Sequence, residues 1–122
     1  YTVMSQKVLV VGASENPSRY SNKAILKLKD NNHEVFALSN SPGEVAGVEI
    51  STKFPNKEMD TLTLYLSSKN QKQYYKDFIN LNPKIIIFNP GSENEELSLL
   101  AHENGIEVIN ACTLVMLSIG DF

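Results

Sequence analysis

The chain has 122 residues, about as many as one globular domain, of which 42% are hydrophobic and 20% are charged. The net charge of −3 at pH 7, without a cluster of lysine and arginine, argues against nucleic acid or an anionic membrane as the main partner. Cys112 is the single cysteine, which excludes an intrachain disulfide, and no apolar run has the ~18 residues of a membrane span, so we expect one cytoplasmic domain over residues 1–122.

The first predicted unit is a strand, a turn and a helix. Four apolar residues that favour strands end at Gly12, small and polar residues follow, and an amphipathic helix is expected from Asn22 to Asn31. Glu34–Leu38 is typical of a second strand, and the spacing fits a right-handed crossover between parallel strands. Because the end of the first strand faces the free amides of the next helix, this unit predicts a site for a phosphate-bearing ligand.

The turn after the first strand departs from the dinucleotide fingerprint G-x-G-x-x-G. Its three glycine positions hold Gly12, Ser14 and Pro17, so only the first matches. The second strand ends in Leu38-Ser39-Asn40, without the acid that accepts hydrogen bonds from the ribose hydroxyls of NAD. Both observations disfavour NAD, and the neutral strand end suits a ribose that bears a phosphate better.

The middle of the chain contains a less regular segment and a third strand. Turn residues occupy 39–43, and the following stretch shows little periodicity, although Gly47–Ile50 favours a short edge strand. Asp60–Leu66 is rich in residues that favour strands. A helix is predicted to begin at Ser67-Ser68 and to close at Asn82-Pro83.

The remaining elements complete an alternating pattern. Lys84–Phe88 is a continuous apolar run, which predicts a central strand buried on both faces. Ser92 and Glu95 have the spacing of a capping box and open a helix that stops at Gly105. A fifth strand and a short apolar helix follow, at Glu107–Ile109 and Thr113–Leu117.

This alternation predicts an α/β fold, a doubly wound parallel five-stranded sheet. In the strand order 3-2-1-4-5, a crevice opens between the first and fourth strands, and the loops Gly12–Ser21 and Asn89–Gly91 lie side by side. With Ser39-Asn40 and Leu66-Ser67, these loops are expected to enclose a ligand cleft.

Several separate motifs occur in order from Lys7 to Phe122. They are Gly12-Ala13-Ser14 with Pro17, Arg19 and Ser21, then Asn40, Leu64-Tyr65-Leu66, Asn89-Pro90-Gly91 with Glu93–Glu96, and Asn110–Leu117. In these motifs the chain resembles the small single-domain CoA-binding proteins, a family similar to the N-terminal CoA-binding domain of succinyl-CoA synthetase α subunits. The resemblance implies a Rossmann-like CoA-binding domain with CoA or an acyl-CoA lying over the strand ends.

The resemblance also implies a set of binding residues. These are Gly12, Ala13, Ser14 and Arg19 near the phosphates with Pro17 in the same loop, Ser21 at the helix start, Asn40 near the adenosine, Leu66 and Ser67 beside the adenine, and Pro90 and Gly91 along the pantetheine. Family members often follow the asparagine with Pro-Lys, and that lysine meets the 3′-phosphate. Here Ser41-Pro42 follows Asn40, which leaves Lys53 as the downstream substitute.

Three functional interpretations follow. The first is a non-catalytic module that binds CoA or an acyl-CoA, with no catalytic or metal-binding residues and no nucleic acid or membrane partner. The second is a small thiol or acyl-transfer enzyme that uses Cys112, although free cysteines are usually buried hydrophobes, and His33 and His102 are predicted on the side away from the cleft. The third is an interaction protein with a vestigial nucleotide cleft. The altered segment after Asn40 is the feature that favours this third interpretation.

Overall fold

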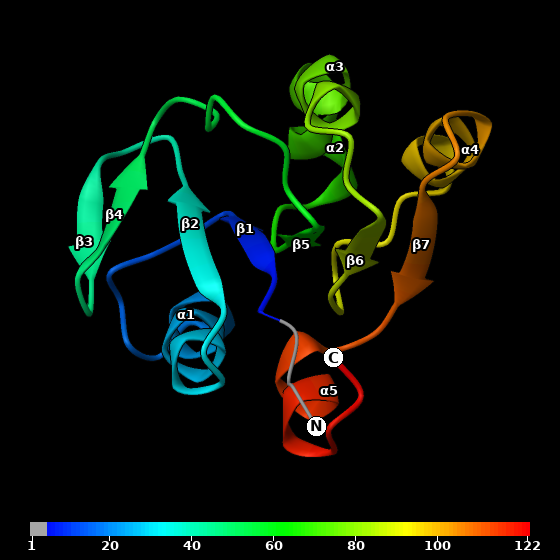
Figure 1. Cartoon of the computed structure of the whole chain (residues 1–122). Helices are drawn as coiled ribbons and strands as arrows, with labels where there is room; N and C mark the ends of the chain where they lie inside the picture. Colours follow the sequence, from blue (N-terminus) through cyan, green and yellow to red (C-terminus); the bar gives the residue numbers. More distant parts are fainter. Residues whose placement is uncertain (1–4) are drawn as a thin grey trace.

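The computed structural model describes residues 5–122 as a seven-stranded sheet with helices on both faces (Figure 1). The strands are β1 (Lys7–Val11), β2 (Glu34–Leu38), β3 (Gly43–Val45), β4 (Val48–Ser51), β5 (Thr61–Leu64), β6 (Ile85–Phe88) and β7 (Glu107–Asn110). The helical segments are α1 (Tyr20–Asp30), α2 (Ser68–Gln71), the 3-10 turn η1 (Lys72–Tyr74), α3 (Tyr75–Asn80), α4 (Glu95–Glu103) and α5 (Thr113–Ser118). The predicted α/β, Rossmann-like parallel sheet is confirmed, with two strands more than the five expected.

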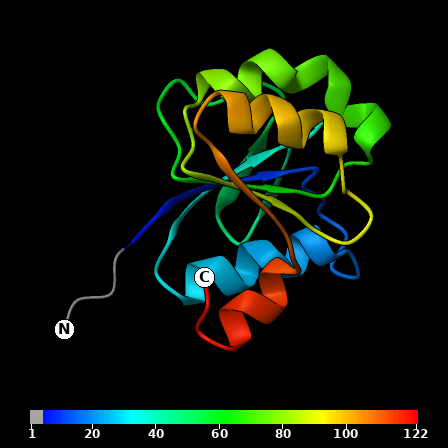
Figure 2. The ribbon, with the colours of Figure 1, turned by 90° about the vertical axis from the view of Figure 1, so that its right-hand side faces the viewer.

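The sheet separates two hydrophobic cores. Helices α1 and α5 cover one face, and α2, α3 and α4 cover the other (Figure 2). On the first face, Ile25 and Leu28 of α1 pack with Leu117 of α5 against the sheet. On the second face, Phe78 and Leu97 lie in the core between the sheet and its helices. Strands buried on both faces explain why their sequences are nearly continuous apolar runs.

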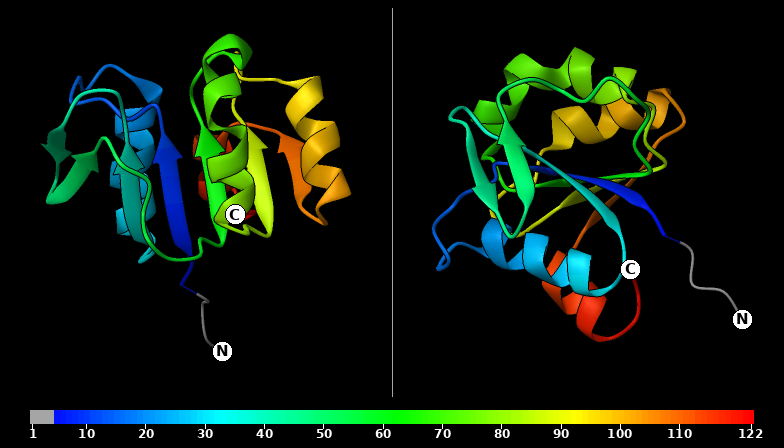
Figure 3. Two further views of the ribbon diagram at one scale, coloured as in Figure 1. Left: turned by 90° about the horizontal axis from the view of Figure 1, so that it is seen from above. Right: turned by 60° about the vertical axis from the view of Figure 1, so that its left-hand side comes forward.

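The predicted strand order was wrong. The observed order is β3-β4-β2-β1-β5-β6-β7, with every neighbouring pair parallel except β3 and β4. We expected the strand after residue 60 to lie beyond β2, but the hairpin of β3 and β4 occupies that edge (Figure 3). Strand β4 pairs Ile50 with Ala37 and Ser51 with Leu38, so β5 pairs with β1 instead. The reversal of strand order therefore lies between β1 and β5.

On the other half of the sheet one prediction is confirmed and one needs correction. Strand β6, expected to be central and buried on both faces, is an interior strand between β5 and β7 with Ile86, Ile87 and Phe88 buried. The helix expected from Ser67 to Asn82 is divided into α2, η1 and α3. The side chain of Gln71 is fully buried and donates to the carbonyls of Leu66 and Ser92, both at 2.8 Å. These two bonds hold α2 against the segments that follow β5 and β6.

The predicted capping box at Ser92 is also wrong. Helix α4 begins at Glu95, and its N-cap is Asn94, whose Oδ1 accepts the Leu97 N–H at 3.0 Å. Ser92 is buried beside the end of β5, and its hydroxyl donates to the Leu64 carbonyl at 2.9 Å. The Ser92 side chain is thus used by a buried strand end, and the helix takes Asn94 as its cap instead.

Candidate functional site

A cleft of about 880 Å³ opens at the carboxyl ends of β1, β2 and β5. Its lining residues are Val11, Gly12, Ala13, Ser14, Ser18, Arg19, Tyr20, Ser21, Leu38, Ser39, Asn40, Tyr65, Leu66, Asn70, Gln73, Tyr74 and Pro90. The volume is in the range of small-molecule sites, and α/β sheets bind ligands at the point where the strand order reverses. The cleft is therefore the candidate site.

Gly12 lets the loop after β1 pack closely on the segment after β5. Its φ is +91°, and a Cβ at this position would lie 3.2 to 3.3 Å from atoms of Tyr65 and Leu66. The N–H groups of Gly12 and Ala13 both donate to the Leu38 carbonyl, at 2.9 and 3.0 Å. These two amides hold β1 to β2, so a ligand phosphate has to find its donors further along the loop.

The rest of this loop is held by its own side chains. The Ser14 hydroxyl accepts the Asn16 N–H at 3.0 Å, and Asn16 Oδ1 accepts the Ser18 N–H at 3.0 Å. Asn22, buried in the first turn of α1, donates its side-chain amide to the Ser14 carbonyl at 2.9 Å. The loop is consequently shaped before any ligand arrives.

The first turn of α1 is open toward the cleft. Arg19 is its N-cap residue and makes no side-chain capping hydrogen bond, and the turn contains no acidic residue. The first amides of a helix lack intrahelical partners, and they carry the positive end of its dipole. Arg19 is also the only charged residue among those that line the cleft in residues 5–122. This end of the cleft is thus suited to an anion such as a phosphate.

The opposite wall comes from the segment that follows β5. Asn70, Gln73 and Tyr74 line the cleft from α2 and η1, and Tyr74 packs edge-on against Phe54, with ring centroids 5.4 Å apart. This wall is anchored below by Gln71 through the carbonyls described above. It supplies an aromatic ring and two amides, groups that suit a heterocyclic base.

Tyr65 forms the floor of the cleft and stays neutral. Burial raises the pKa of its phenol to about 12, against the opposing effect of the neighbouring Thr63 and Thr113 hydroxyls. Those two hydroxyls lie 2.8 Å apart and bond to each other, and the Tyr65 hydroxyl has no hydrogen-bond partner within residues 5–122. The phenol therefore keeps its proton at neutral pH and is not a base there.

Eight of the twelve predicted site residues line the cleft: Gly12, Ala13, Ser14, Arg19, Ser21, Asn40, Leu66 and Pro90. Pro17 is exposed in the first loop, and Ser67 is the N-cap of α2 beside Leu66. Gly91 follows Pro90 with a φ of +95°. Lys53 lies on a second hollow of about 580 Å³, together with Lys29 and Phe36.

The loops Gly12–Ser21 and Asn89–Gly91 were predicted to be neighbours, and β5 separates the strands that lead to them. Only Pro90 of the second loop therefore lines the cleft, and Asn89 is buried beneath it.

Ser18 and Tyr20 also line the cleft, from the loop Gly12–Ser21 that was expected to enclose it, whereas Asn70, Gln73 and Tyr74 were missed. Asn70 and Gln73 stand three residues apart at the start of a helical segment after a buried strand, so the polar pair at that spacing was an available signal.

The groups considered for chemistry lie outside the cleft lining. Cys112 is half-buried and is the N-cap of α5. His33 follows α1, and His102 lies in the last turn of α4. No group of three or more metal-ligating side chains is found in the part of the chain that the structure describes. None of its helices is long and apolar enough to cross a bilayer.

Comparison with solved structures gives near-complete matches. An uncharacterized protein of known crystal structure is 43% identical, with a TM-score of 0.94 over 98% of this chain and 100% of that chain. A hypothetical protein from Pyrococcus horikoshii OT3 is 24% identical, with a TM-score of 0.85 over 94% of this chain and 83% of that chain.

The same fold forms part of a larger enzyme. Acetyl-coenzyme A synthetase 1 from Ca. Korarchaeum cryptofilum is 20% identical with a TM-score of 0.71, over 86% of this chain but 25% of that chain. At this identity the likeness concerns the fold alone. A search of functionally curated proteins found no match.

The family is shown by a match along nearly the whole chain. A family model described as a CoA binding domain matches residues 6–118. This range includes the loop after β1, the open first turn of α1 and the wall after β5. The resemblance inferred from the motifs is confirmed, and the chain belongs to the family of CoA-binding domains.

Proposed function

We propose that this chain binds coenzyme A or an acyl-CoA in the cleft, as a module without chemistry of its own. The observation that carries the proposal is the open first turn of α1 beside Arg19, the one charged residue lining the cleft within residues 5–122. The diphosphate would lie against these groups, since amides and a guanidinium are the donors that phosphate oxygens prefer. The family to which the chain belongs supports the same class of ligand.

The residues that line the two sides of the cleft suggest where the adenosine and the pantetheine of CoA would lie. The adenosine would lie between Asn40 and the wall of Asn70, Gln73 and Tyr74, and the pantetheine would leave past Pro90. NAD suits this cleft less, because the end of β2 carries no carboxylate for its ribose hydroxyls.

A binding role is favoured over catalysis by the chemistry of the cleft. Cys112, the nucleophile of the alternative thiol enzyme, does not line the cleft. The fold also recurs as a quarter of a much longer synthetase chain, which suits a module that holds the nucleotide.

Calorimetric titration with CoA and acetyl-CoA tests the proposal. Arg19→Ala is expected to weaken binding by about 1 to 3 kcal/mol, the range for a lost charge-assisted contact. Lys27→Ala is the matched control, since it removes one positive charge from the exposed face of α1 and should leave the affinity unchanged. Absence of binding at millimolar CoA would contradict the proposal, and turnover of acetyl-CoA that depends on Cys112 would replace it with the thiol enzyme.

A further inference from the structure

The lining of the cleft is shared unevenly among the strand ends. Strands β1, β2 and β5 and the segments that follow them supply every lining residue but one, and the segment after β6 supplies only Pro90. Within residues 5–122, neither β7 nor α5 contributes to the lining. The cleft therefore surrounds the proposed place of the nucleotide on several sides, and it borders the proposed path of the pantetheine at a single residue.

The backbone of the loop at Pro90 has its donors in use. Pro90 itself lacks an N–H group. The Gly91 N–H donates to Glu93 Oε1 at 2.9 Å, and the Ser92 N–H donates to the Asn89 carbonyl at 2.8 Å. Both amides after Pro90 are thus bonded within the turn itself, unlike the first amides of α1.

The remaining donors of this loop bond to the buried end of β5. The Asn89 N–H donates to the Leu64 carbonyl at 3.4 Å, and its side-chain amide donates to that carbonyl and to Thr63 Oγ1. The Ser92 hydroxyl also donates to the Leu64 carbonyl. Asn89 and Ser92 are both only 2% exposed. Every N–H and O–H group from Asn89 to Ser92 therefore has a partner inside the protein.

This arrangement bears on the acyl end of the proposed ligand. Pantetheine carries amide carbonyls and an acyl-CoA adds a thioester carbonyl, and all of these oxygens accept hydrogen bonds. The loop has no donor left for them, so carbonyls that pass Pro90 keep their bonds to water. The diphosphate differs, because Arg19 and the open first turn of α1 supply donors to it.

We infer that the cleft recognises the nucleotide half of CoA and leaves the thioester outside, so that it binds CoA with any acyl group equally well. The inference rests on the proposed function and names its ligand class. A site distinguishes two ligands only through groups that contact the part in which they differ. Acyl groups differ beyond Pro90, where the described part of the chain supplies no lining residue.

Calorimetric titrations with whole and divided ligands test the inference. CoA, acetyl-CoA and benzoyl-CoA are expected to bind within about twofold of one another, and 3′-phosphoadenosine 5′-diphosphate, which is CoA without its pantetheine, within about fivefold of CoA. The other half, 4′-phosphopantetheine, should bind at least about a hundredfold more weakly than CoA, because it lacks the base, the ribose and all but one of the phosphates.

A thiol reagent gives a readout that does not depend on affinity. With the protein in excess, so that nearly all CoA is bound, the CoA thiol should react with dithiobis(nitrobenzoate) at the rate of free CoA. The experiment uses Cys112→Ser, which removes the protein's only thiol at a position outside the cleft lining. The matched control combines Cys112→Ser with Arg19→Ala, in which less CoA is bound, and the two rates should be equal.

The outcomes separate this inference from the proposed function. A preference beyond about twofold for one acyl group, loss of binding by the nucleotide half, or protection of the CoA thiol from the reagent would overturn the inference and leave CoA binding in place. Failure of CoA, its acyl esters and both of its halves to bind at millimolar concentration would overturn the proposed function and the inference together.

Discussion

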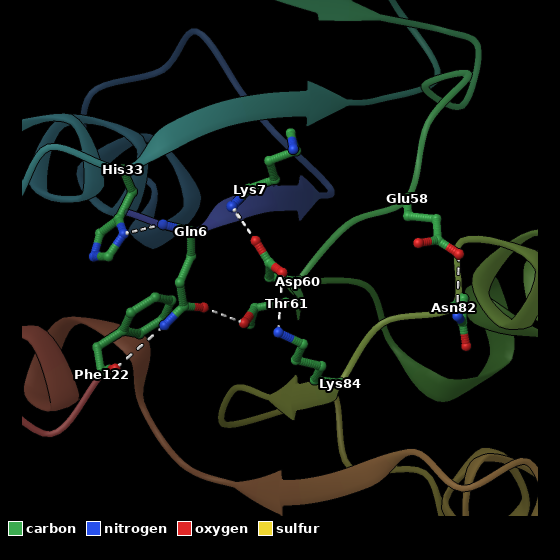
Figure 4. A network of polar contacts seen from close by, with 9 residues as sticks. All are labelled: Gln6, Lys7, His33, Glu58, Asp60, Thr61, Asn82, Lys84 and Phe122. Atoms are coloured by element: carbon green, nitrogen blue, oxygen red, sulfur yellow. Dashed lines mark hydrogen bonds and ion pairs between the residues drawn. The ribbon is translucent and has the colours of Figure 1, made fainter. Parts of the chain in front are cut away.

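The amino and carboxyl ends of the strands differ in how their polar groups are hydrogen-bonded. At the amino end, polar side chains bond to backbone groups or to one another (Figure 4). Asp60 Oδ2 accepts the Lys7 N–H at 2.7 Å, and the Thr61 hydroxyl donates to Gln6 Oε1 at 2.6 Å. At the carboxyl end, the first turn of α1 has no side-chain cap. The first amides of α1, next to Arg19 in the cleft, are therefore available to a ligand.

The largest effect is expected just beneath the cleft, at Asn89. Its side chain is buried and donates to Thr63 Oγ1 at 2.7 Å and to the Leu64 carbonyl at 2.9 Å, and it accepts the Thr113 N–H at 2.9 Å. Asn89→Ala leaves the buried Thr113 N–H without its acceptor and removes one donor each from Thr63 and the Leu64 carbonyl, which keep their bonds to Thr113 and Ser92. It should lower the free energy of unfolding by about 2 to 4 kcal/mol in urea denaturation. Asn70→Ala, an exposed lining residue, is the control and should change stability by less than about 0.5 kcal/mol. Similar losses of stability in the two variants would show that the buried residue beneath the cleft contributes no more to folding than a residue that lines it.

The second effect concerns Asp60 in the amino-end network. Asp60→Ala removes the acceptor of the Lys7 N–H and should cost about 1 to 2 kcal/mol of stability. Lys84→Ala removes only the exposed ion pair at 3.7 Å and should cost less than about 0.5 kcal/mol. Neither change should alter CoA affinity, measured by calorimetry, and a weakened affinity in Asp60→Ala would break the proposed separation of the two ends.

A smaller effect depends on pH through His33. Burial lowers the pKa of His33 below 6.5, and its neutral Nδ1 accepts the Gln6 N–H at 3.1 Å. Below pH 6.5 the unfolded chain takes up this proton more readily than the folded one, so stability falls as the pH decreases. We expect the decrease in Tm between pH 7.5 and 5.5 to be smaller in His33→Gln than in the wild type. His102→Gln should behave as the wild type, and an unchanged pH profile in His33→Gln would show that carboxylates alone set it.

The smallest effect is expected at Gly43. Gly43→Ala forces the Glu15 side chain away, and because Glu44 is exposed its N–H can bond to water instead. The expected loss of stability is at most about 0.5 kcal/mol by thermal denaturation. A loss of several kcal/mol would show that the contact of Glu15 with Gly43 and Glu44 is needed to hold the hairpin of β3 and β4.

The sequence predicted most elements because their apolar patterns are local. The apolar run of β6 and the strand, turn and helix around Gly12 were recognised, since burial on both faces leaves a clear trace in composition. Strand order was not predicted, because the choice of neighbour for β5 depends on the hairpin of β3 and β4, whose short strands have little periodicity.

The site was predicted where one segment carries it. Gly12 to Ser21 is contiguous, so its lining residues were found together, whereas Asn70 and Gln73 become lining residues only when β5 lies beside β1. Lys53 was proposed as the contact of the ribose phosphate only because it follows Asn40 in the chain. The segment after β4 places it on the second hollow instead of the cleft lining.

The central position of β1 also has a consequence during synthesis. Val8 pairs with Val35 on one side and with Thr61 on the other, so β1 lacks its second neighbour until the chain has been made as far as β5. Until β5 has left the ribosome, one edge of an almost wholly apolar strand stays open to other chains. A ribosome that pauses between β4 and β5 would expose that edge for longer, which makes the timing of translation in this segment a determinant of how much protein folds correctly.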